Sequence, residues 1–253
     1  MNMKLSIITV SYNSAATIED TIKSVLGQTH EDVEYIIVDG GSTDGTVDII
    51  ERYADRGVAR WTSGPDRGIY DAMNKGIGMA TGEVVGILNS DDVYYDRDVL
   101  TDVAAVFVEK KVESCYGDLV YMDKGLGRVV RRWVSEAYKD GLFEKGWSPP
   151  HPSFFVRRQA YERYGLFDPG FSLAADYELM LRFIRKHRVS TAYIPRVLVK
   201  MRVGGASNRS LLNIARQNVE CYRAWKHNGM CASPAIIIRK LASRLRQFTL
   251  ARG

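Results

Sequence analysis

Residues 33–46 read VEYIIVDGGSTDGT, and this stretch decides the fold that we expect for the chain. The apolar, β-branched run at 33–38 is typical of a buried strand. Residues 39–45 contain three glycines and several side chains that form local hydrogen bonds, so they predict a loop. A helix is predicted at 46–53. A buried strand followed by a polar loop and a helix is the building unit of a parallel α/β sheet.

The same unit recurs before and after this stretch. Strands are predicted at 5–10, 58–62 and 84–88, with helices between them at 18–27 and 70–80. This alternation predicts an α/β fold with a mainly parallel central sheet that is flanked by helices on both faces. Ligands of such sheets bind beyond the carboxyl ends of the strands.

The second half of the chain has a less regular pattern. A helix is expected at 99–108, followed by a small antiparallel element with strands at 113–122 and 128–134. Further predicted elements are a strand at 153–156, a helix at 176–186, strands at 189–194 and 197–203, and a helix at 210–227. A last helix is predicted to begin at Ser233-Pro234, with serine as its cap and proline in its first turn. The chain is therefore expected to end in a helical extension.

Composition excludes several classes of protein. With 45% hydrophobic and 26% charged residues, the chain has enough apolar surface to fold, so extended disorder is not expected. No run of about 18 apolar residues is present, so no membrane-spanning segment is predicted. The three cysteines, Cys115, Cys221 and Cys231, are odd in number and far apart. They favour a reducing, cytoplasmic location over a disulfide framework.

The net charge of +5 comes from the C-terminal tail. Residues 234–253 contain five basic side chains and no acidic one, whereas the other 233 residues carry 30 of each sign, which argues against nucleic-acid binding. In the tail, Ile238, Leu241, Leu245 and Phe248 recur at helical spacing, with the basic residues towards other faces. This pattern is typical of an amphipathic helix on an anionic membrane surface. The alternative is a helix that docks on the body or on a dimer partner.

Polar side chains follow three of the predicted parallel strands. Ser11 follows the first strand, Asp39 the second, and the tetrapeptide Asn-Ser-Asp-Asp at 89–92 the fourth. Because the carboxyl ends of parallel strands share one edge, we expect these loops to converge there. Asp39 is suited to accept hydrogen bonds from a nucleotide base or ribose, with Thr9 or Ser11 lining the base pocket. The alternatives are a local turn at Asp39 and ordinary strand-end polarity at Thr9 and Ser11.

Two adjacent carboxylates, Asp91 and Asp92, lie shortly after the end of the fourth predicted strand. Such a pair is suited to hold a hard divalent cation, Mn²⁺ or Mg²⁺, and to leave coordination positions for phosphate oxygens and water. The alternative is a solvated turn that caps the following helix. The convergence of the other loops at the same edge favours the cation site.

Residues 64–76 read GPDRGIYDAMNKG and concentrate polar groups at the start of a helix. The helical spacing sets Asp71, Asn74 and Lys75 on neighbouring turns, shortly after Asp66 and Arg67. Acid, amide and ammonium groups on one face are suited to a polyhydroxyl ring that is joined to a diphosphate. The alternative is a polar helix cap.

The later part of the chain offers a candidate general base. Asp176 begins a predicted helix, where an acid is either a cap or, when partly desolvated, a base for an acceptor hydroxyl. Trp147, His151 and Glu178 are secondary candidates for the acceptor site. Trp147 would stack on a sugar ring or belong to the core, and His151, set among three prolines, would reach the site or be structural.

Together these segments resemble the inverting family 2 glycosyltransferases with the Rossmann-like GT-A fold, especially bacterial enzymes of exopolysaccharide, O-antigen or colanic acid synthesis. The likeness is carried by residues 6–13 (SIITVSYN), 37–46 (IVDGGSTDGT), 66–76 (DRGIYDAMNKG) and 88–92 (LNSDD). It is looser between 147 and 205, where HPSFF at 151–155, ADYEL at 175–179 and GGAS at 204–207 are comparable.

The resemblance implies roles for these residues. Asp39 would contact uracil or another base with Thr9 nearby, Asp91 and Asp92 would serve the metal and the diphosphate, and Asp176 would be the base. Members usually have aspartate where this chain has Asn89, whose amide oxygen can coordinate or bind a donor but brings no charge.

The implied domain plan is a GT-A catalytic domain at 1–209, with a nucleotide-sugar-binding half at 1–110 and an acceptor-binding half at 111–209, and C-terminal helices at 210–253. The implied reaction is transfer from a nucleotide sugar, with UDP as the expected nucleotide, to a saccharide or polyprenyl-diphosphate-linked acceptor. We expect a cytoplasmic enzyme, at the inner face of the membrane if the tail binds lipid. The alternatives are a nucleotidyltransferase of similar fold and a non-catalytic nucleotide-sugar-binding protein.

Overall fold

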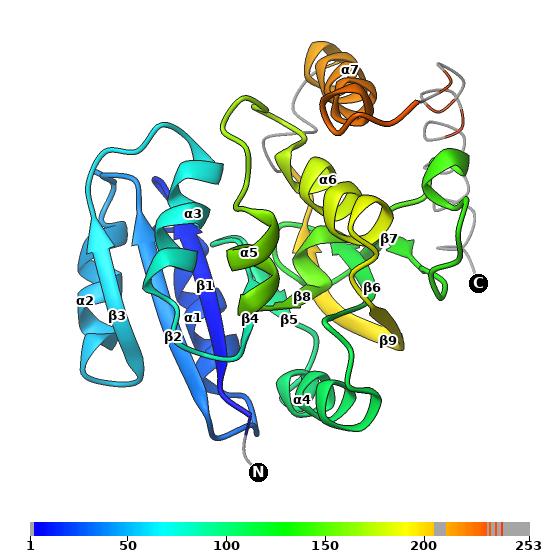
Figure 1. Ribbon diagram of the computed structural model, residues 1–253. Coiled ribbons are helices and arrows are strands. Elements are labelled where there is room, and N and C mark those ends of the chain that lie inside the picture. The colour runs from blue at the N-terminus through cyan, green and yellow to red at the C-terminus, as the bar shows by residue number, and fades with distance from the viewer. Residues whose placement is uncertain (1–2, 205–210, 232, 234–235, 237–238, 240–253) are drawn as a thin grey trace.

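The computed structural model describes residues 3–204 and 211–231, together with Ser233, Ile236 and Arg239. Among these residues, nine strands form one curled sheet in the order β3-β2-β1-β4-β8-β6-β9-β5, with β7 paired to β6 (Figure 1). Helices lie against the sheet, and the last described helix, α7, lies beyond α6 at one end of the molecule (Figure 1).

The first four strands form the parallel half of the sheet. They are β1 (Leu5–Ser11), β2 (Val33–Asp39), β3 (Val58–Ser63) and β4 (Val84–Ile87), and they alternate with α1 (Ile18–Leu26), α2 (Thr46–Ala54) and α3 (Ile69–Met79). β1 pairs with β2 and β4, and β2 pairs with β3, all in parallel. The predicted α/β fold is therefore confirmed, and these elements lie close to their predicted bounds.

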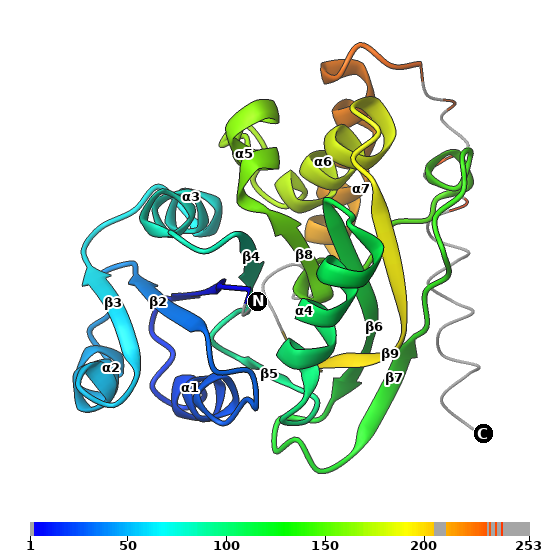
Figure 2. The same cartoon turned by 60° about the horizontal axis from the view of Figure 1, so that its bottom comes forward.

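Helices cover both faces of this half, with α1 and α2 on one face and α3 on the other (Figure 2). Leu5 and Ile7 of β1 pack with residues of α1 and α2, whereas Ile8 and Val10 pack with residues of α3. Alternate side chains of a strand point to opposite faces, so a continuous apolar strand fills two cores at once.

α3 lies very close to β1. A Cβ added at Gly76 would be only 2.4 Å from Cγ2 of Ile8, so glycine is what allows the helix to approach the strand this closely. Because α3 begins shortly after β3, its first turns lie beside the carboxyl edge of the parallel strands. The close contact at Gly76 therefore helps to fix the polar residues of α3 at that edge.

The second half of the chain completes the sheet with mixed pairing. Its strands are β5 (Asp92–Tyr94), β6 (Ser114–Met122), β7 (Val129–Trp133), β8 (Phe154–Arg157) and β9 (Thr191–Arg202). β6 and β7 form the expected antiparallel element. β8 is antiparallel to β4 and β6, β5 is antiparallel to β9, and β6 runs parallel to β9.

The helices of this half are α4 (Val99–Lys110), α5 (Arg158–Tyr164), α6 (Ala175–Met180), the π-helical segment η3 (Leu181–Lys186) and α7 (Leu211–His227). Short 3₁₀ turns, η1 (Phe143–Lys145) and η2 (His151–Ser153), lie between β7 and β8. The sequence pattern did not predict α5 or the three-residue strand β5. It predicted one helix at 176–186, where α6 continues into η3.

β9 is one strand where the pattern predicted two, at 189–194 and 197–203. Its pairing with β6 continues from Ile194 opposite Gly117 to Val197 opposite Asp118, so Pro195 and Arg196 form an irregularity within the strand. Proline cannot donate to a ladder hydrogen bond, and a local bulge accommodates it without ending the strand.

The predicted amphipathic tail lies almost entirely outside the described residues. Of its positions, Ile236 is buried in the hydrophobic core and Arg239 donates a 3.0 Å hydrogen bond from Nη1 to the carbonyl oxygen of Glu144. These two residues contact the body of the protein. Among the helices that the structure describes, none combines the length and apolar character needed to cross a membrane.

We predict that Gly76→Ala lowers the free energy of unfolding by about 1–3 kcal/mol, because the new methyl group would overlap Ile8 in a packed core. Urea unfolding followed by circular dichroism measures this change. Gly78→Ala in the same helix is the matched control, because an added Cβ there meets nothing within 4 Å and alanine favours helix. Equal stability of the two variants would contradict the close approach.

Candidate active site

The loops that follow β1, β2 and β3 converge on one carboxylate. Ser11 Oγ donates to Asp39 Oδ1 at 2.9 Å, and Ser63 Oγ donates to Asp39 Oδ2 at 2.7 Å. These three residues are the last of their strands, and the parallel register sets Asp39 opposite both serines. The predicted convergence at one sheet edge is thus present around Asp39.

Asp39 also organises its own loop. Its Oδ2 accepts the backbone N–H groups of Gly41 (3.0 Å) and Ser42 (2.8 Å), and its Oδ1 accepts the Ser42 hydroxyl at 2.5 Å. The side chain is only 1% exposed. Burial raises the pKa of the carboxyl, but the hydrogen bonds from Ser42, Ser63 and Ser11 outweigh it, so the pKa is lowered overall. The group is therefore held as an anion.

A second set of bonds joins this loop to the acidic tetrapeptide. Asn13, at a φ of 48°, accepts from Thr43 N–H through its Oδ1 (3.0 Å) and donates its own N–H to Ser42 Oγ (2.8 Å). One residue later, Ser14 Oγ accepts a 2.8 Å bond from Ser90 Oγ. The segment 11–14 is thus a bridge between Asp39 and residues 89–92.

The carboxylates of the tetrapeptide differ in their surroundings. Asp92 is fully buried, whereas Asp91 is half-buried. Asn89 Nδ2 donates to Asp92 Oδ2 at 3.2 Å, while Asn89 Oδ1 and Asp92 Oδ1 are buried without a hydrogen-bond partner. Burial, reinforced by the charge of Asp91, raises the pKa of Asp92 well above its usual range.

These oxygens fit a hard divalent cation. Two buried oxygen atoms without partners, beside a second carboxylate, are the type of donor set that Mn²⁺ and Mg²⁺ prefer, and a cation would offset the cost of burying Asp92. Within the described part of the chain, no three His, Cys, Asp or Glu side chains form a metal site by themselves.

Arg202, at the end of β9, holds the same tetrapeptide and was not predicted as a site residue. It is 6% exposed, its Nη1 donates to the carbonyl oxygen of Asp91 (2.9 Å), and its Nη2 pairs with Asp20 Oδ2 (2.5 Å). A charged residue at the end of an apolar strand is a weak sequence signal. Its partners are 111 and 182 residues away, so only the fold reveals them.

The segment 64–76 contacts the Asp39 loop through Asp66. Asp66 Oδ1 accepts Gly68 N–H at 2.8 Å, and a Cβ added at Gly40 would lie 2.6 Å from Asp66 Oδ2. Glycine at 40 therefore permits a direct contact between the two loops. The loop of Asp66 therefore lies at the same carboxyl edge of the parallel strands as Asp39, and we call this edge the rim.

The polar residues of α3 divide into two groups. Asp71 pairs with Arg67 (3.2 Å) and Lys75 (3.3 Å) at the surface, and hydrogen bonding from the backbone of Arg67, followed by these pairs, lowers its pKa. Asn74 instead faces the second half of the chain. It donates to the carbonyl oxygen of Phe167 (2.8 Å) and accepts from its N–H (3.0 Å).

Asp176, on α6, meets the first half of the chain through Tyr70. The Tyr70 hydroxyl donates to Asp176 Oδ1 at 3.2 Å, and the Tyr70 ring stacks on Phe167 with centroids 5.6 Å apart. His151 packs edge-on against the same Phe167 ring at 5.9 Å. Burial lowers the pKa of His151 against the opposing effect of Asp176, so the imidazole is kept neutral near the carboxylate.

Three predicted site residues are engaged in internal contacts. Thr9 is fully buried and accepts from the Tyr35 hydroxyl at 3.0 Å. Glu178 is 1% exposed and pairs with Arg182 at 2.9 Å. Trp147 packs against Tyr116, Tyr138 and Phe143, with centroids 5.3–5.6 Å apart, and its buried Nε1 has no hydrogen-bond partner.

The site combines a buried anion under the rim, an acidic loop suited to a cation, and a carboxylate on the facing half. Residues 6–166 match the family described as Glycosyl transferase family 2. The chain belongs to glycosyltransferase family 2. The resemblance seen in the sequence motifs is therefore confirmed.

Relatives of this family 2 glycosyltransferase support the assignment. The chain is 34% identical over 206 residues to the PGL/p-HBAD biosynthesis glycosyltransferase of Mycobacterium bovis, a match that covers 80% of this chain and 78% of the relative. It is 42% identical over 177 residues to an uncharacterized glycosyltransferase of Nostoc sp., covering 66% of this chain and 55% of that one.

Solved structures share the fold. S. aureus TarS 1-349 in complex with UDP-GlcNAc has a TM-score of 0.68 at 17% identity and is matched over 99% of this chain and 76% of its own. The mannosyltransferase PcManGT of Pyrobaculum calidifontis, in complex with GDP-Man and Mn²⁺, has a TM-score of 0.68 at 19% identity, over 99% and 73%. The chain spans 44% of the longer TarS structure. These likenesses confirm the GT-A fold for this family 2 glycosyltransferase.

We predict that Asp39→Asn lowers the free energy of unfolding at neutral pH by about 2 kcal/mol, because the amide turns N–H groups towards backbone donors. The pKa of Asp39 is lower in the folded state than in the unfolded state. The ionised carboxylate therefore stabilises the fold at pH values above the unfolded-state pKa. This stabilisation is lost as the pH falls through the folded-state pKa. The difference between wild type and variant, measured by urea unfolding, should therefore shrink on acidification. Exposed Asp55→Asn is the control, and a difference independent of pH would contradict the prediction.

Proposed function

We propose that this enzyme transfers a sugar from a nucleotide-diphosphate donor, with UDP-sugars preferred, to a hydroxyl of a saccharide or lipid-linked saccharide, with inversion at the anomeric carbon. The observation that supports this most is the hydrogen bond from Tyr70 to Asp176. It joins α3, whose first turns lie beside the carboxyl edge of the parallel strands, to a carboxylate on the facing half of the chain, so this carboxylate is held close to the edge where the donor would bind.

The donor would bind along the rim of the parallel strands. Asp39, backed by Ser11, offers an anion near the base and ribose, and Asp66, Asp71, Asn74 and Lys75 occupy the adjoining segment. TarS and PcManGT, which share the fold, were solved with UDP-GlcNAc and with GDP-Man. In the present geometry Asn74 and Thr9 act chiefly by holding the walls of this site, since their polar atoms bind Phe167 and Tyr35.

The metal would be held at residues 89–92. Asp91, which is half-buried, would reach the cation and the diphosphate from the solvent side, while Asn89 and Asp92 would contribute the buried oxygens that have no hydrogen-bond partner. A bound Mn²⁺ or Mg²⁺ would offset the negative charge that develops on the departing diphosphate.

Asp176 would act as the general base in a single displacement. The acceptor oxygen forms a bond to the anomeric carbon as its proton passes to the Asp176 carboxylate. The bond from that carbon to the diphosphate oxygen breaks, and its electron pair leaves with the nucleoside diphosphate. Tyr70 orients the carboxylate by donating to Oδ1. Attack opposite the leaving group inverts the anomeric configuration.

The acceptor would approach from the side of Trp147 and His151. Trp147 offers an aromatic face beside Tyr138, and Glu178 would act indirectly, since it is enclosed by Arg182 and Asn228. We propose a role in bacterial surface polysaccharide synthesis at the cytoplasmic side of the membrane, in accord with the basic tail. A lipid-linked acceptor would make attachment to the membrane surface useful.

We predict that Asp176→Asn lowers the turnover of sugar transfer about 1,000-fold, because the amide cannot take the acceptor proton. Donor affinity, measured by thermal shift with a panel of nucleotide sugars and Mn²⁺, should remain within about twofold of wild type, because the donor rim is unchanged. The experiment measures released nucleoside diphosphate and the anomeric configuration of the product. Asp55→Asn serves as the matched control.

The same assay separates the alternatives. A nucleotidyltransferase would instead consume a nucleoside triphosphate and release pyrophosphate, and a non-catalytic binding protein would show the thermal shift without turnover. Full activity of the Asp176→Asn variant would remove Asp176 from the role of base.

We predict that replacing Lys240, Arg244 and Arg246 by glutamine weakens binding to anionic vesicles about 100-fold, because each basic residue near the surface contributes about 1 kcal/mol. Flotation with phosphatidylglycerol vesicles measures the bound fraction, and phosphatidylcholine vesicles are the control. If the bound fraction is the same for wild type and variant, the tail is no membrane anchor.

A further inference from the structure

α7 contacts the segment immediately before Asp176. Glu220 of α7 accepts three consecutive backbone N–H groups, from Ser172 to Oε1 at 3.1 Å and from Leu173 and Ala174 to Oε2 at 2.8 and 2.9 Å. A carboxylate that binds several backbone donors forms strong, charge-assisted hydrogen bonds. Glu220 thereby fixes the three residues that lead into α6.

α6 has no cap of its own. Its N-cap residue, Ala174, has no side chain that can accept a hydrogen bond, and the structure has none at this position. Helix starts are usually stabilised by a polar side chain from the cap residue itself. Here the anion comes from another helix, 46 residues further along the chain.

α7 also holds the residues that directly follow Asp176. Trp225 Nε1 donates to the Tyr177 hydroxyl at 2.9 Å, and Nδ2 of Asn228, the residue directly after α7, donates to Glu178 Oε1 at 2.9 Å. Trp225 is 1% exposed, so the helix is anchored in the core at this point. Residues on both sides of Asp176 are therefore bonded to a single element.

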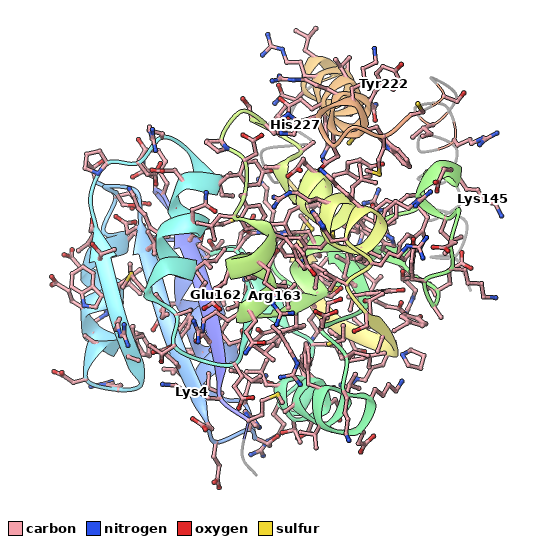
Figure 3. The ribbon with its side chains drawn as sticks, viewed as in Figure 1. Lys4, Lys145, Glu162, Arg163, Tyr222 and His227 are labelled. Atoms are coloured by element: carbon pink, nitrogen blue, oxygen red, sulfur yellow. The ribbon has the colours of Figure 1, made fainter. Side chains whose placement is uncertain are left out.

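Residues of α7, α3 and η3 also hold the loop between α5 and α6. His227 is the last residue of α7 (Figure 3). Its Nε2 lies 3.1 Å from Asp168 Oδ2. Asn74 binds the backbone of Phe167 from α3, and Arg182 of η3 donates to the carbonyl oxygens of Gly165 and Leu166. Within this set, Glu220 acts nearest to Asp176 along the chain.

We propose that Glu220 is a positioning residue for Asp176 and that α7 is part of the catalytic unit, although the sequence pattern assigned residues 210–253 to an extension. This inference rests on the proposed role of Asp176 as the base. The family match ends at residue 166, before Asp176 and before α7, so it assigns no role to either. A misplaced base loses turnover far more than it loses donor binding, because a displacement of about 1 Å can slow a reaction about 100-fold.

The test compares Glu220→Ala and Glu220→Gln with wild type in the full-length enzyme. We expect turnover to fall about 10- to 100-fold in Glu220→Ala and by less in Glu220→Gln, whose amide oxygen still accepts. The KM for the donor nucleotide sugar should remain within about twofold, since the donor rim is on other loops. Arg216→Gln, an exposed position on the same helix, is the matched control and should retain wild-type turnover.

A double-mutant cycle separates positioning from general stability. If Glu220 acts through Asp176, Glu220→Ala should cause little further loss in the Asp176→Asn background, as measured from the residual rate with labelled donor. Thermal unfolding of each variant identifies the temperature range in which all are folded. Should Glu220→Ala fail to fold there, Glu220→Gln takes its place in the cycle.

Unchanged turnover in the Glu220 variants, or an equal loss with and without Asp176, would overturn the inference. Wild-type enzyme in the same assay distinguishes this from failure of the proposed function. If wild type transfers no sugar from any donor of the panel, the proposed function is wrong and the inference falls with it.

Discussion

The buried carboxylate of Asp39 is the constraint on which the parallel half of the sheet depends. An anion at 1% exposure is costly unless donors surround it, and here the donors come from the ends of β1 and β3 and from the loop that follows β2. The same hydrogen bonds that keep Asp39 charged therefore hold the ends of β1, β2 and β3 next to one another. The bridge through Asn13 and Ser14 extends this order to the acidic loop at 89–92.

α3 links this ordered rim to the second half of the enzyme. Gly76 lets the helix lie against β1, and Tyr70 and Asn74 then reach the loop and helix that hold Phe167 and Asp176. Tyr70 combines a stacked ring with a hydroxyl bond, so it contributes both apolar contact and orientation. A family 2 glycosyltransferase must hold its donor and acceptor in a fixed relative position. The contacts of Tyr70 and Asn74 between the two halves of the chain are a way to achieve this.

The sequence predicted the parallel half well because its signals are local. The run at 33–38 and the glycine-rich loop after it identify a strand and its end without knowledge of any other segment. β5, α5 and the unbroken β9 were missed for the opposite reason, since pairing with distant strands decides them. Pro195 reads as a strand end in sequence, but the pairing of β9 with β6 on either side of it keeps the strand continuous.

The site residues show the same difference between local and distant sequence signals. The carboxylates of Asp39, Asp91 and Asp92 are recognisable from their positions after strands, whereas Arg202 and Glu220 gain their meaning only from partners far along the chain. For Asp71 and Lys75, helical spacing predicted proximity correctly, and they pair with each other at 3.3 Å. Their part in donor binding stays a prediction.

Arg202 helps to explain how the adjacent carboxylates of Asp91 and Asp92 are accommodated at the rim. Burial and the charge of Asp91 raise the pKa of Asp92, and the nearby guanidinium of Arg202 acts in the opposite direction. Arg202 binds the backbone oxygen of Asp91 and the carboxylate of Asp20, and its charge favours the ionised form of Asp92. At the proposed metal site, a cation would then meet oxygens whose position is already set. The protein thus fixes the geometry of the acidic loop beforehand, so the proposed binding of metal and diphosphate would not have to order it.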